Sequence, residues 1–279
     1  MKYRLLAIDI DGTLLNHERV ISPRVQKAVK AANAAGCIVT LATGRRHREA
    51  RRVANELGLD VPLIMYCGSI IYDTATNHAL YHKPLKPEFI QQAVSVILEV
   101  GFQPVVLQSP LQGEHIYLGP PENDDDYLRE YAENNRRADL ISRINYSEMA
   151  EVADALTVVA IGRYTDISLL HKTIGSDFDC QIFNYVLTHK KMVDLHGFDF
   201  VQPGVGKGVA LGELAAHFGL DLSQTVAIGD SQNDVDMLTA AGLGIAMGNA
   251  PLDVQQQAKV VVSTNRDDGV AEAIERFIL

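Results

Sequence analysis

The sequence is poor in cysteine. Cys37, Cys67 and Cys180 are an odd number of thiols, and no two of them form a C-x-x-C pair. A disulfide framework is therefore not indicated, and we expect reduced thiols in a cytoplasmic protein. The nine histidines include no H-E-x-x-H pairing, so the sequence does not predict a zinc site of that type.

Long hydrophobic runs and an excess of positive charge are also missing. No stretch approaches the roughly 18 uninterrupted apolar residues of a membrane helix. Residues 1–4 lead directly into a short predicted strand, without the apolar region of a signal peptide. The formal net charge is −10 and the pI is about 5.3, which argues against general binding to nucleic acid or to an anionic membrane. We expect neither as a partner, and the sequence does not indicate an oligomeric state.

The chain does have 279 residues, 47% of them hydrophobic, which is enough for one large or two moderate domains. In its first and last parts, predicted strands alternate with predicted helices, and this order is typical of a parallel sheet with right-handed crossovers. The predicted strands are residues 5–8, 37–42, 61–66, 225–228, 244–247 and 260–262. The predicted helices are residues 23–35, 46–57, 207–218, 233–241 and 270–279, and a hairpin is predicted within 69–82.

A linker is predicted at residues 83–87, which are rich in proline and lysine. Beyond it, strands mixed with a few helices predict a small α+β domain with an antiparallel sheet. Its predicted helices are 88–100, 124–134 and 167–174, and its predicted strands are 105–108, 115–118, 156–161, 181–187 and 191–195. We therefore predict a doubly wound α/β core of residues 1–83 and 197–279, with an α+β domain of residues 84–196 inserted into it.

A first candidate site follows the first predicted strand. Residues 5–8 are an apolar run typical of a buried parallel strand, and Asp9 and Asp11 come directly after it. Residues i and i+2 of an extended chain point to one side, so we expect the two carboxylates to converge at the end of the strand. Two carboxylates this close repel unless a cation lies between them or one is protonated, which suggests a divalent metal. Alone, the pair equally fits a solvated turn.

A second apolar strand, at 225–228, ends in a similar way. Gly229 and Asp230 follow it, and Asn233 and Asp234 lie close behind. If both strands are central and parallel, Asp230 and Asp234 face Asp9 and complete an oxygen-rich site suited to Mg²⁺. Asn233 and Asp234 are also good residues for starting a helix. Capping is therefore a competing interpretation of one of them.

A third stretch, residues 203–208 (PGVGKG), is similar to nucleotide-binding loops without meeting their patterns. It lacks a Ser or Thr after Gly-Lys, and Val209 stands where the dinucleotide fingerprint needs its last glycine. This argues against a dinucleotide-dependent oxidoreductase. Taken alone, Lys207 would be interpreted as a surface residue and Thr43 as an ordinary strand residue.

Taken in order, four stretches resemble the four motifs of haloacid dehalogenase-like (HAD) phosphohydrolases. They are residues 9–13 (DIDGT), 43–45 (TGR), 207–208 (KG) and 229–234 (GDSQND). Residues 241–250 (AGLGIAMGNA) and 268–271 (DGVA) resemble the Cof-type subfamily of these enzymes. The resemblance implies a Rossmann-like core with a cap domain inserted between the second and third motifs, which is the place that residues 84–196 occupy.

The resemblance also implies roles for individual residues. Asp9 would be the nucleophile that forms an aspartyl-phosphate, and Asp11 would be the general acid and base. Mg²⁺ would be held by Asp9, Asp11 (through a backbone carbonyl) and Asp230, with Asp234 nearby or in the second coordination shell. The phosphoryl oxygens would be bound by Thr43, Gly44 (through its amide), Lys207 and Asn233.

From this resemblance we expect a cytoplasmic, Mg²⁺-dependent phosphatase acting on small phosphorylated metabolites, either sugar phosphates or phosphorylated cofactors. Two alternatives stay open: a phosphotransferase or phosphomutase with the same aspartyl-phosphate, and a non-catalytic protein that keeps the fold. Two departures concern substrate contacts, because Cys67 stands where many relatives have Asn and Gly206 where a polar residue is common. Candidates for contacts to the leaving group in the insert, which equally fit simple packing, are His115, Tyr117, Asn184 and Tyr185.

Overall fold

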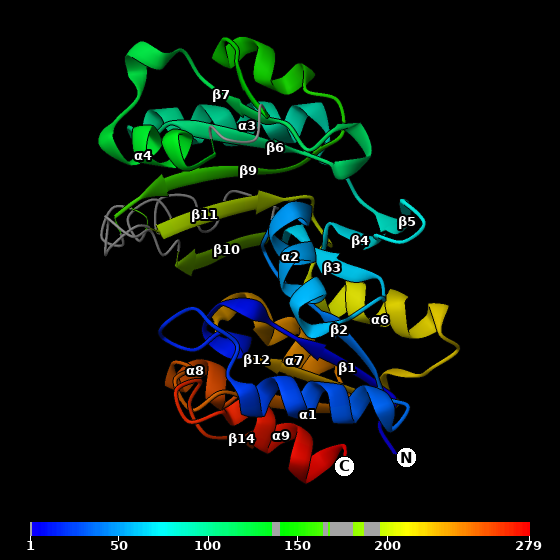
Figure 1. Cartoon of the computed structure of the whole chain (residues 1–279). Helices are drawn as coiled ribbons and strands as arrows, with labels where there is room; N and C mark the ends of the chain where they lie inside the picture. Colours follow the sequence, from blue (N-terminus) through cyan, green and yellow to red (C-terminus); the bar gives the residue numbers. More distant parts are fainter. Residues whose placement is uncertain (1, 136–139, 164–166, 168–180, 187–195) are drawn as a thin grey trace. The chain divides into compact units, whose positions relative to one another are not determined.

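The computed structural model describes residues 2–135, 140–163, 167, 181–186 and 196–279. These residues form two compact units, of which the first combines Met1–His82 with Val205–Leu279 and the second is Lys83–Gly204. We call them the core unit and the inserted unit. The core unit is therefore built from two segments of chain that are far apart in sequence (Figure 1).

A five-stranded parallel sheet forms the centre of the core unit, in the order β14-β13-β12-β1-β2. The strands are β1 (Leu5–Ile8), β2 (Ile38–Leu41), β12 (Thr225–Gly229), β13 (Leu243–Ala246) and β14 (Val260–Val261). Every residue of β1 is buried, as its apolar run predicts. Because β1 lies between β2 and β12, the first strand of the chain joins the two distant segments.

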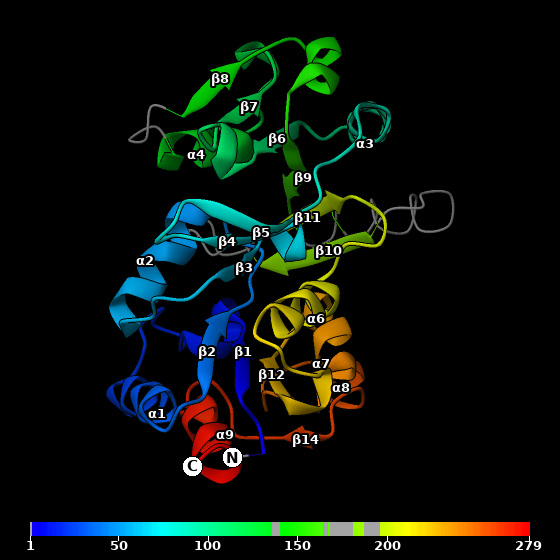
Figure 2. The ribbon, with the colours of Figure 1, turned by 90° about the vertical axis from the view of Figure 1, so that its right-hand side faces the viewer.

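Helices cover both faces of this sheet. Figure 2 shows α1 and α9 on one side of β1, β2 and β12, and α6 and α7 on the other. The helices are α1 (Pro23–Ala34), α2 (His47–Leu57), α6 (Lys207–His217), α7 (Val235–Ala240), α8 (Leu252–Gln255) and α9 (Gly269–Phe277). The start of α1 is fixed as expected, because Ser22 Oγ accepts the Val25 N–H at 3.2 Å and Pro23 follows the cap. The doubly wound α/β architecture is confirmed.

A small antiparallel sheet adjoins β2. It consists of β3 (Leu63–Met65), β4 (Ile70–Asp73) and β5 (His78–His82), and the β4–β5 pair is the predicted hairpin. The third predicted strand was expected to belong to the main parallel sheet, but among the described residues β3 reaches β2 through one isolated bridge, Ala42 to Ile64. Its regular pairing is with β4 because the chain reverses directly after it, in the tight turn η2 (Tyr66–Gly68).

The inserted unit contains a sheet whose described strands follow the order β10-β11-β9-β6-β7-β8. They are β6 (Pro104–Gln108), β7 (Ile116–Leu118), β8 (Ile141–Arg143), β9 (Ala155–Gly162), β10 (Gln181–Val186) and β11 (His196–Val201). All neighbours are antiparallel except β7 and β8. Its described residues include the helices α3 (Pro87–Glu99) and α4 (Asp126–Asn135), and α3 packs its apolar face into a cluster with Val106, Val158 and Phe198.

The inserted unit ends later than the sequence predicts. Residues 197 onward were expected to belong to the core, but β11 pairs with β9 and β10, so the unit extends to Gly204. Neither β11 nor the short strand β8 was expected, and the boundary was misplaced because the pairing of β11 with β9 depends on residues distant in sequence. The helix predicted at 167–174, except for Ile167, and the strand predicted at 191–195 lie outside the described residues.

No helix in the part of the chain that the structure describes has both the length and the apolar character needed to cross a membrane. Short helical turns join several elements: η1 (Ile10–Leu14), η3 (Pro110–Gln112), η4 (Pro121–Asn123), η6 (Tyr146–Glu151), η7 (Leu222–Gln224) and η8 (Gln232–Asp234). Two of them, η1 and η8, lie at the ends of β1 and β12 and shape the candidate site.

Candidate active site

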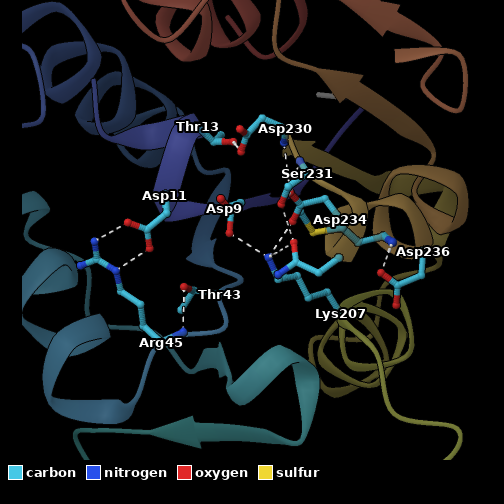
Figure 3. Close-up of polar contacts among 12 residues, drawn as sticks. Asp9, Asp11, Thr13, Thr43, Arg45, Lys207, Asp230, Ser231, Asp234 and Asp236 are labelled. Atoms are coloured by element: carbon cyan, nitrogen blue, oxygen red, sulfur yellow. Dashed lines mark hydrogen bonds and ion pairs between the residues drawn. The ribbon is translucent and has the colours of Figure 1, made fainter. Parts of the chain in front are cut away.

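The carboxyl ends of β1, β2 and β12 meet at one edge of the parallel sheet. Ile8 is in register with Leu41 on one side and Ile228 on the other, and the Asp9 N–H continues the ladder to the Ile228 carbonyl at 3.0 Å. Asp9, Thr43 and Asp230 therefore emerge at the same edge (Figure 3). Open α/β sheets bind their ligands at this edge.

Lys207 places its ammonium group between the two acidic turns. Its side chain is fully buried, and Nζ donates to Asp9 Oδ1 at 2.7 Å and to Asp234 Oδ1 at 2.6 Å. Asn233 Oδ1 lies 3.5 Å from the same nitrogen. A lysine that would alone be interpreted as a surface residue is thus at the centre of a buried group of charges (Figure 3).

The position of Lys207 is set by close packing of α6 against α7. A Cβ on Gly208 would lie 2.6 Å from the Asp236 carbonyl oxygen, so only glycine allows this approach. The Gly208 N–H donates to Asp236 Oδ2 at 2.7 Å. This contact fixes the first turn of α6 and with it the origin of the Lys207 side chain.

Asp234 holds its own turn together. Its Oδ2 accepts the N–H groups of Asp230 and Ser231, both at 3.0 Å. Asp234 is fully buried. The predicted capping role is present here, because Ser231 and Asp234 form a capping box around η8. Asp234 therefore combines a cap with an ion pair to Lys207.

Burial dominates the electrostatics of these groups. Loss of hydration and the nearby Asp234 charge raise the pKa of Asp9 well above its ordinary value, although Lys207 opposes this. The same two causes raise the pKa of Asp230 to about 7. Burial would lower the pKa of Lys207, but the charges of Asp234 and Asp9 outweigh it and the pKa is raised, so the ammonium stays charged.

The cluster fits a divalent cation. Asp9, Asp230 and Asp234 each offer a carboxylate oxygen, and these atoms lie within 4.8 Å of one another. Three carboxylates against the single charge of Lys207 leave an excess of negative charge that a cation would compensate. All the donors are oxygens, which hard cations such as Mg²⁺, Ca²⁺ and Mn²⁺ prefer.

Asp11 departs from the expected arrangement. Its carboxylate does not converge with that of Asp9. It forms a bidentate ion pair with Arg45, in which Nε donates to Oδ2 and Nη2 donates to Oδ1, both at 2.7 Å (Figure 3). The expectation assumed an extended chain through Asp11, whereas the strand ends at Ile8 and the chain makes a wide turn in which Leu14 N–H bonds to the Asp9 carbonyl. The helical turn η1 begins at Ile10, between the two aspartates, so the i, i+2 rule does not apply.

Thr43 and Gly44 occupy the turn after β2. Thr43 is buried, and its Oγ1 accepts the Arg45 N–H at 3.1 Å. The carbonyl of Thr43 accepts the N–H of Cys67, whose φ of 54° is unusual for a residue other than glycine. This hydrogen bond joins the turn after β2 to the turn η2 after β3. Cys67, which stands where many relatives have Asn, therefore lies beside the site.

Comparison with known proteins agrees with this geometry. A family model described as haloacid dehalogenase-like hydrolase matches residues 6–274. The chain belongs to this family. The resemblance that the four motifs indicate is confirmed, and the chain is a haloacid dehalogenase-like hydrolase.

Relatives within the HAD-like hydrolases are similar along their whole length. A pyridoxal phosphate phosphatase of Escherichia coli is 27% identical over 302 residues, covering 100% of both chains. A 5-amino-6-(5-phospho-D-ribitylamino)uracil phosphatase of Bacillus subtilis is 28% identical over 283 residues, covering 99% of this chain and 96% of the relative. A solved haloacid dehalogenase-like hydrolase from Bacteroides thetaiotaomicron is 26% identical, with a TM-score of 0.76 and coverage of 98% and 99%.

Three polar residues of the site had no role predicted from the sequence. Thr13 and Arg45 lie inside motifs of the HAD-like hydrolases but their partners were not foreseen: Thr13 Oγ1 donates to Asp230 Oδ1 at 2.9 Å, and Arg45 pairs with Asp11. Asp236 has no signal in the local pattern, because its partner Gly208 is distant in sequence. In the inserted unit, Tyr117 packs against the apolar cluster of α3, which fits the packing interpretation.

Proposed function

We propose that this chain is a Mg²⁺-dependent phosphatase that hydrolyses small phosphorylated metabolites through an aspartyl-phosphate. The observation that carries the proposal is the buried contact of Lys207 with Asp9, beside Asp230 and Asp234. A carboxylate and an ammonium held together at the edge of a parallel sheet suit a nucleophile and a phosphate-binding group. The relatives named as phosphatases of pyridoxal phosphate and of a phosphorylated ribitylamino-uracil support the substrate class.

Mg²⁺ would be held by Asp9, Asp230 and the backbone carbonyl of Asp11, and it would stabilise negative charge on the phosphoryl group. We place Asp234 outside the set of direct ligands. Its Oδ2 already accepts two backbone N–H groups and its Oδ1 accepts the ammonium of Lys207. Its remaining capacity to bind a cation is therefore smaller than that of Asp9 or Asp230.

In the proposed reaction, an oxygen of Asp9 attacks phosphorus while the bond from phosphorus to the leaving oxygen breaks. Asp11 gives a proton to that oxygen, then accepts a proton from the water that attacks phosphorus, and the bond to Asp9 breaks to release phosphate. The developing charge on the phosphoryl oxygens is met by Thr43, Gly44, Lys207 and Asn233. Thr43 suits this role because its Oγ1 accepts the Arg45 N–H, which leaves the hydroxyl hydrogen to be donated.

The proposal requires Asp11 to leave Arg45 during the cycle. The bidentate ion pair with Arg45 requires Asp11 to be ionised, whereas the leaving oxygen requires a proton from the Asp11 carboxyl group. The Asp11 side chain is 37% exposed and that of Arg45 is 20% exposed, so Asp11 can turn towards solvent when the pair opens, while Arg45 loses a partner in partly buried surroundings. We therefore interpret the Asp11–Arg45 pair as the resting arrangement.

The test is phosphate release from a panel of phosphorylated cofactors and sugar phosphates, with Mg²⁺ or with EDTA, in the wild type and in Asp9→Asn. We expect release that needs Mg²⁺ and is lost in the variant, and a hydroxylamine-sensitive phosphoprotein in wild type after acid quench. Asp253→Asn, at an exposed position in α8, is the matched control. Full activity in Asp9→Asn would contradict the mechanism, and faster transfer to an alcohol than to water would favour a phosphotransferase.

A cytoplasmic location is part of the proposal. Cys37 is a buried free thiol, as expected of a protein from a reducing compartment. Fractionation of cells that express the full chain, followed by immunodetection, tests the location. Recovery in a secreted or membrane fraction would contradict it.

A further inference from the structure

Asn249 stands in the loop after β13, within the stretch MGNA that the proposed chemistry leaves without a role. The residue is exposed, yet both ends of its side-chain amide have partners. Nδ2 donates to the Gly12 carbonyl at 2.9 Å and to Asp230 Oδ2 at 3.2 Å. One side chain therefore joins the turn after β1 to the carboxylate after β12.

The oxygen of the same side-chain amide also has a partner. Asn249 Oδ1 accepts the N–H of Asn265 at 2.8 Å, and Asn265 Nδ2 donates to the Leu15 carbonyl at 2.9 Å. Two asparagines from different loops thus form a chain of hydrogen bonds that begins and ends on the turn after β1. An exposed amide that water could solvate equally well is instead fixed in orientation by partners at both ends.

The hydrogen bonds of Asn249 to Gly12 and Asp230 are important because these two residues lie in very close contact. A Cβ on Gly12 would lie 2.2 Å from Asp230 Oδ2, so small movements of the turn displace the carboxylate. Thr13 holds the other oxygen, Oδ1, at 2.9 Å. Asp230 is therefore oriented from both sides, by Thr13 on one oxygen and by Asn249 on the other.

The geometry points to Asn249 as a positioning residue that sets the affinity of the site for a divalent cation, by fixing the Asp230 carboxylate against the Gly12 turn. The inference rests on the proposed function only in taking Asp230 as a cation ligand. Mg²⁺ requires near-octahedral geometry and tolerates little displacement of its ligands. Partners that orient a ligand typically change metal affinity about 10–100-fold when they are removed.

The experiment measures binding of Mg²⁺ by calorimetry to the full chain without substrate. We expect Asn249→Ala to weaken the affinity about 10–100-fold, with kcat at saturating Mg²⁺ within a few-fold of wild type. Asn55→Ala, at an exposed position of α2, is the matched control and should bind as wild type does. Asn249→Gln, which keeps the amide but moves it by one methylene group, should show a smaller loss and serves if the alanine variant does not fold.

Wild-type affinity in both Asn249 variants would overturn the inference, as would a loss of kcat at saturating Mg²⁺ with no change in affinity. Asp230→Asn provides the reference loss, and normal binding in that variant would overturn it too. The binding measurement needs no turnover. A chain whose Mg²⁺ affinity depends on Asp230 and on Asn249 but which hydrolyses nothing would refute the proposed function and leave this inference standing.

Discussion

The turns after β1 and β12 carry similar residues but hold them in different ways. Each has a first aspartate at the end of a strand and a second one a few residues later. In the β1 turn, the second carboxylate, Asp11, is 37% exposed and is held by Arg45 alone among the described contacts. In the β12 turn, the second carboxylate, Asp234, is fully buried and bonded to Lys207 and to two backbone N–H groups.

The difference in burial indicates that the Asp11 carboxylate can change partners, whereas the Asp234 carboxylate is fixed. The Asp11–Arg45 pair is partly exposed, with side chains 37% and 20% accessible, so opening it costs less than opening a fully buried pair. Opening the Asp234–Lys207 pair leaves buried charges without partners, at a cost of about 3–5 kcal/mol. The β1 turn therefore suits proton transfer, and the β12 turn suits a fixed framework.

The largest expected effect is that of Lys207→Met, which removes the positive charge shared by the two turns. Asp9 and Asp234 would remain buried without a counter-charge, so we expect the free energy of unfolding to fall by about 3–5 kcal/mol and phosphate release to be lost. Urea unfolding with and without Mg²⁺ measures this. Because a cation would compensate the excess negative charge, the loss should be smaller with Mg²⁺, and an equal loss under both conditions would argue against a cation at this place.

Asp11→Asn and Asp234→Asn compare the two second carboxylates directly. For Asp11→Asn we expect kcat to fall about 10²–10⁴-fold, the range for general acid–base catalysis, with a smaller loss of stability than in Asp234→Asn because the Asp11–Arg45 pair is partly exposed. For Asp234→Asn we expect a loss of about 1–3 kcal/mol, because an amide cannot accept from Lys207 and from both backbone groups as the carboxylate does. Equal losses of stability in the two variants, measured by urea unfolding, would break the comparison.

A smaller effect on function is expected from Asp236→Ala, which removes the side-chain contact to the first turn of α6. The Gly208 N–H would lose a bond to a charged acceptor at 2.7 Å, a contact of a kind worth about 1.5–3 kcal/mol. Because Lys207 is the neighbouring residue, we expect a several-fold weaker affinity for inorganic phosphate as a product inhibitor. Asp221→Asn, at an exposed capping position before η7, is the control, and unchanged phosphate affinity would limit Asp236 to a purely structural role.

The smallest expected effect is a pH-dependent change in stability caused by Glu272 of α9. Hydrogen bonds from Ser263, followed by that from Arg276, lower the pKa of Glu272 from 4.5 to about 2. A lowered pKa stabilises the fold above pH 4.5, and the contribution is lost as the pH falls from about 4.5 to about 2. We therefore expect Glu272→Gln to be less stable than wild type near pH 7 and the difference to shrink over that range. Unfolding curves at several pH values check this, and a constant difference would contradict it.

Much of the site could be predicted because it depends on short, local patterns. Apolar runs end at Ile8 and Ile228, and in a parallel sheet their carboxyl ends meet, so the approach of Asp9 and Asp230 follows from the sequence. The direction of Asp11 could not be predicted in this way. It depends on the chain leaving the extended conformation at Ile10, where η1 begins, and on the distant partner Arg45.

The inserted unit was harder to predict for the same reason. The strand at residues 196–201 was not predicted, and its place in the insert is decided by pairing with residues more than thirty positions earlier, such as Val158. Lys207 gives a second case. Its burial results from the packing of Gly208 on Asp236, and no pattern within α6 indicates that contact.

The position of β1 between β2 and β12 has a consequence for synthesis of the chain on the ribosome. One edge of β1 stays without its partner until residue 229 has been made, and at about 5–20 residues per second this takes on the order of ten to forty seconds after β2 emerges. An unpaired apolar strand edge is prone to association with other chains. The nascent core unit is therefore a natural client for chaperones, and the contact of Lys207 with Asp9 can form only when most of the translation is complete.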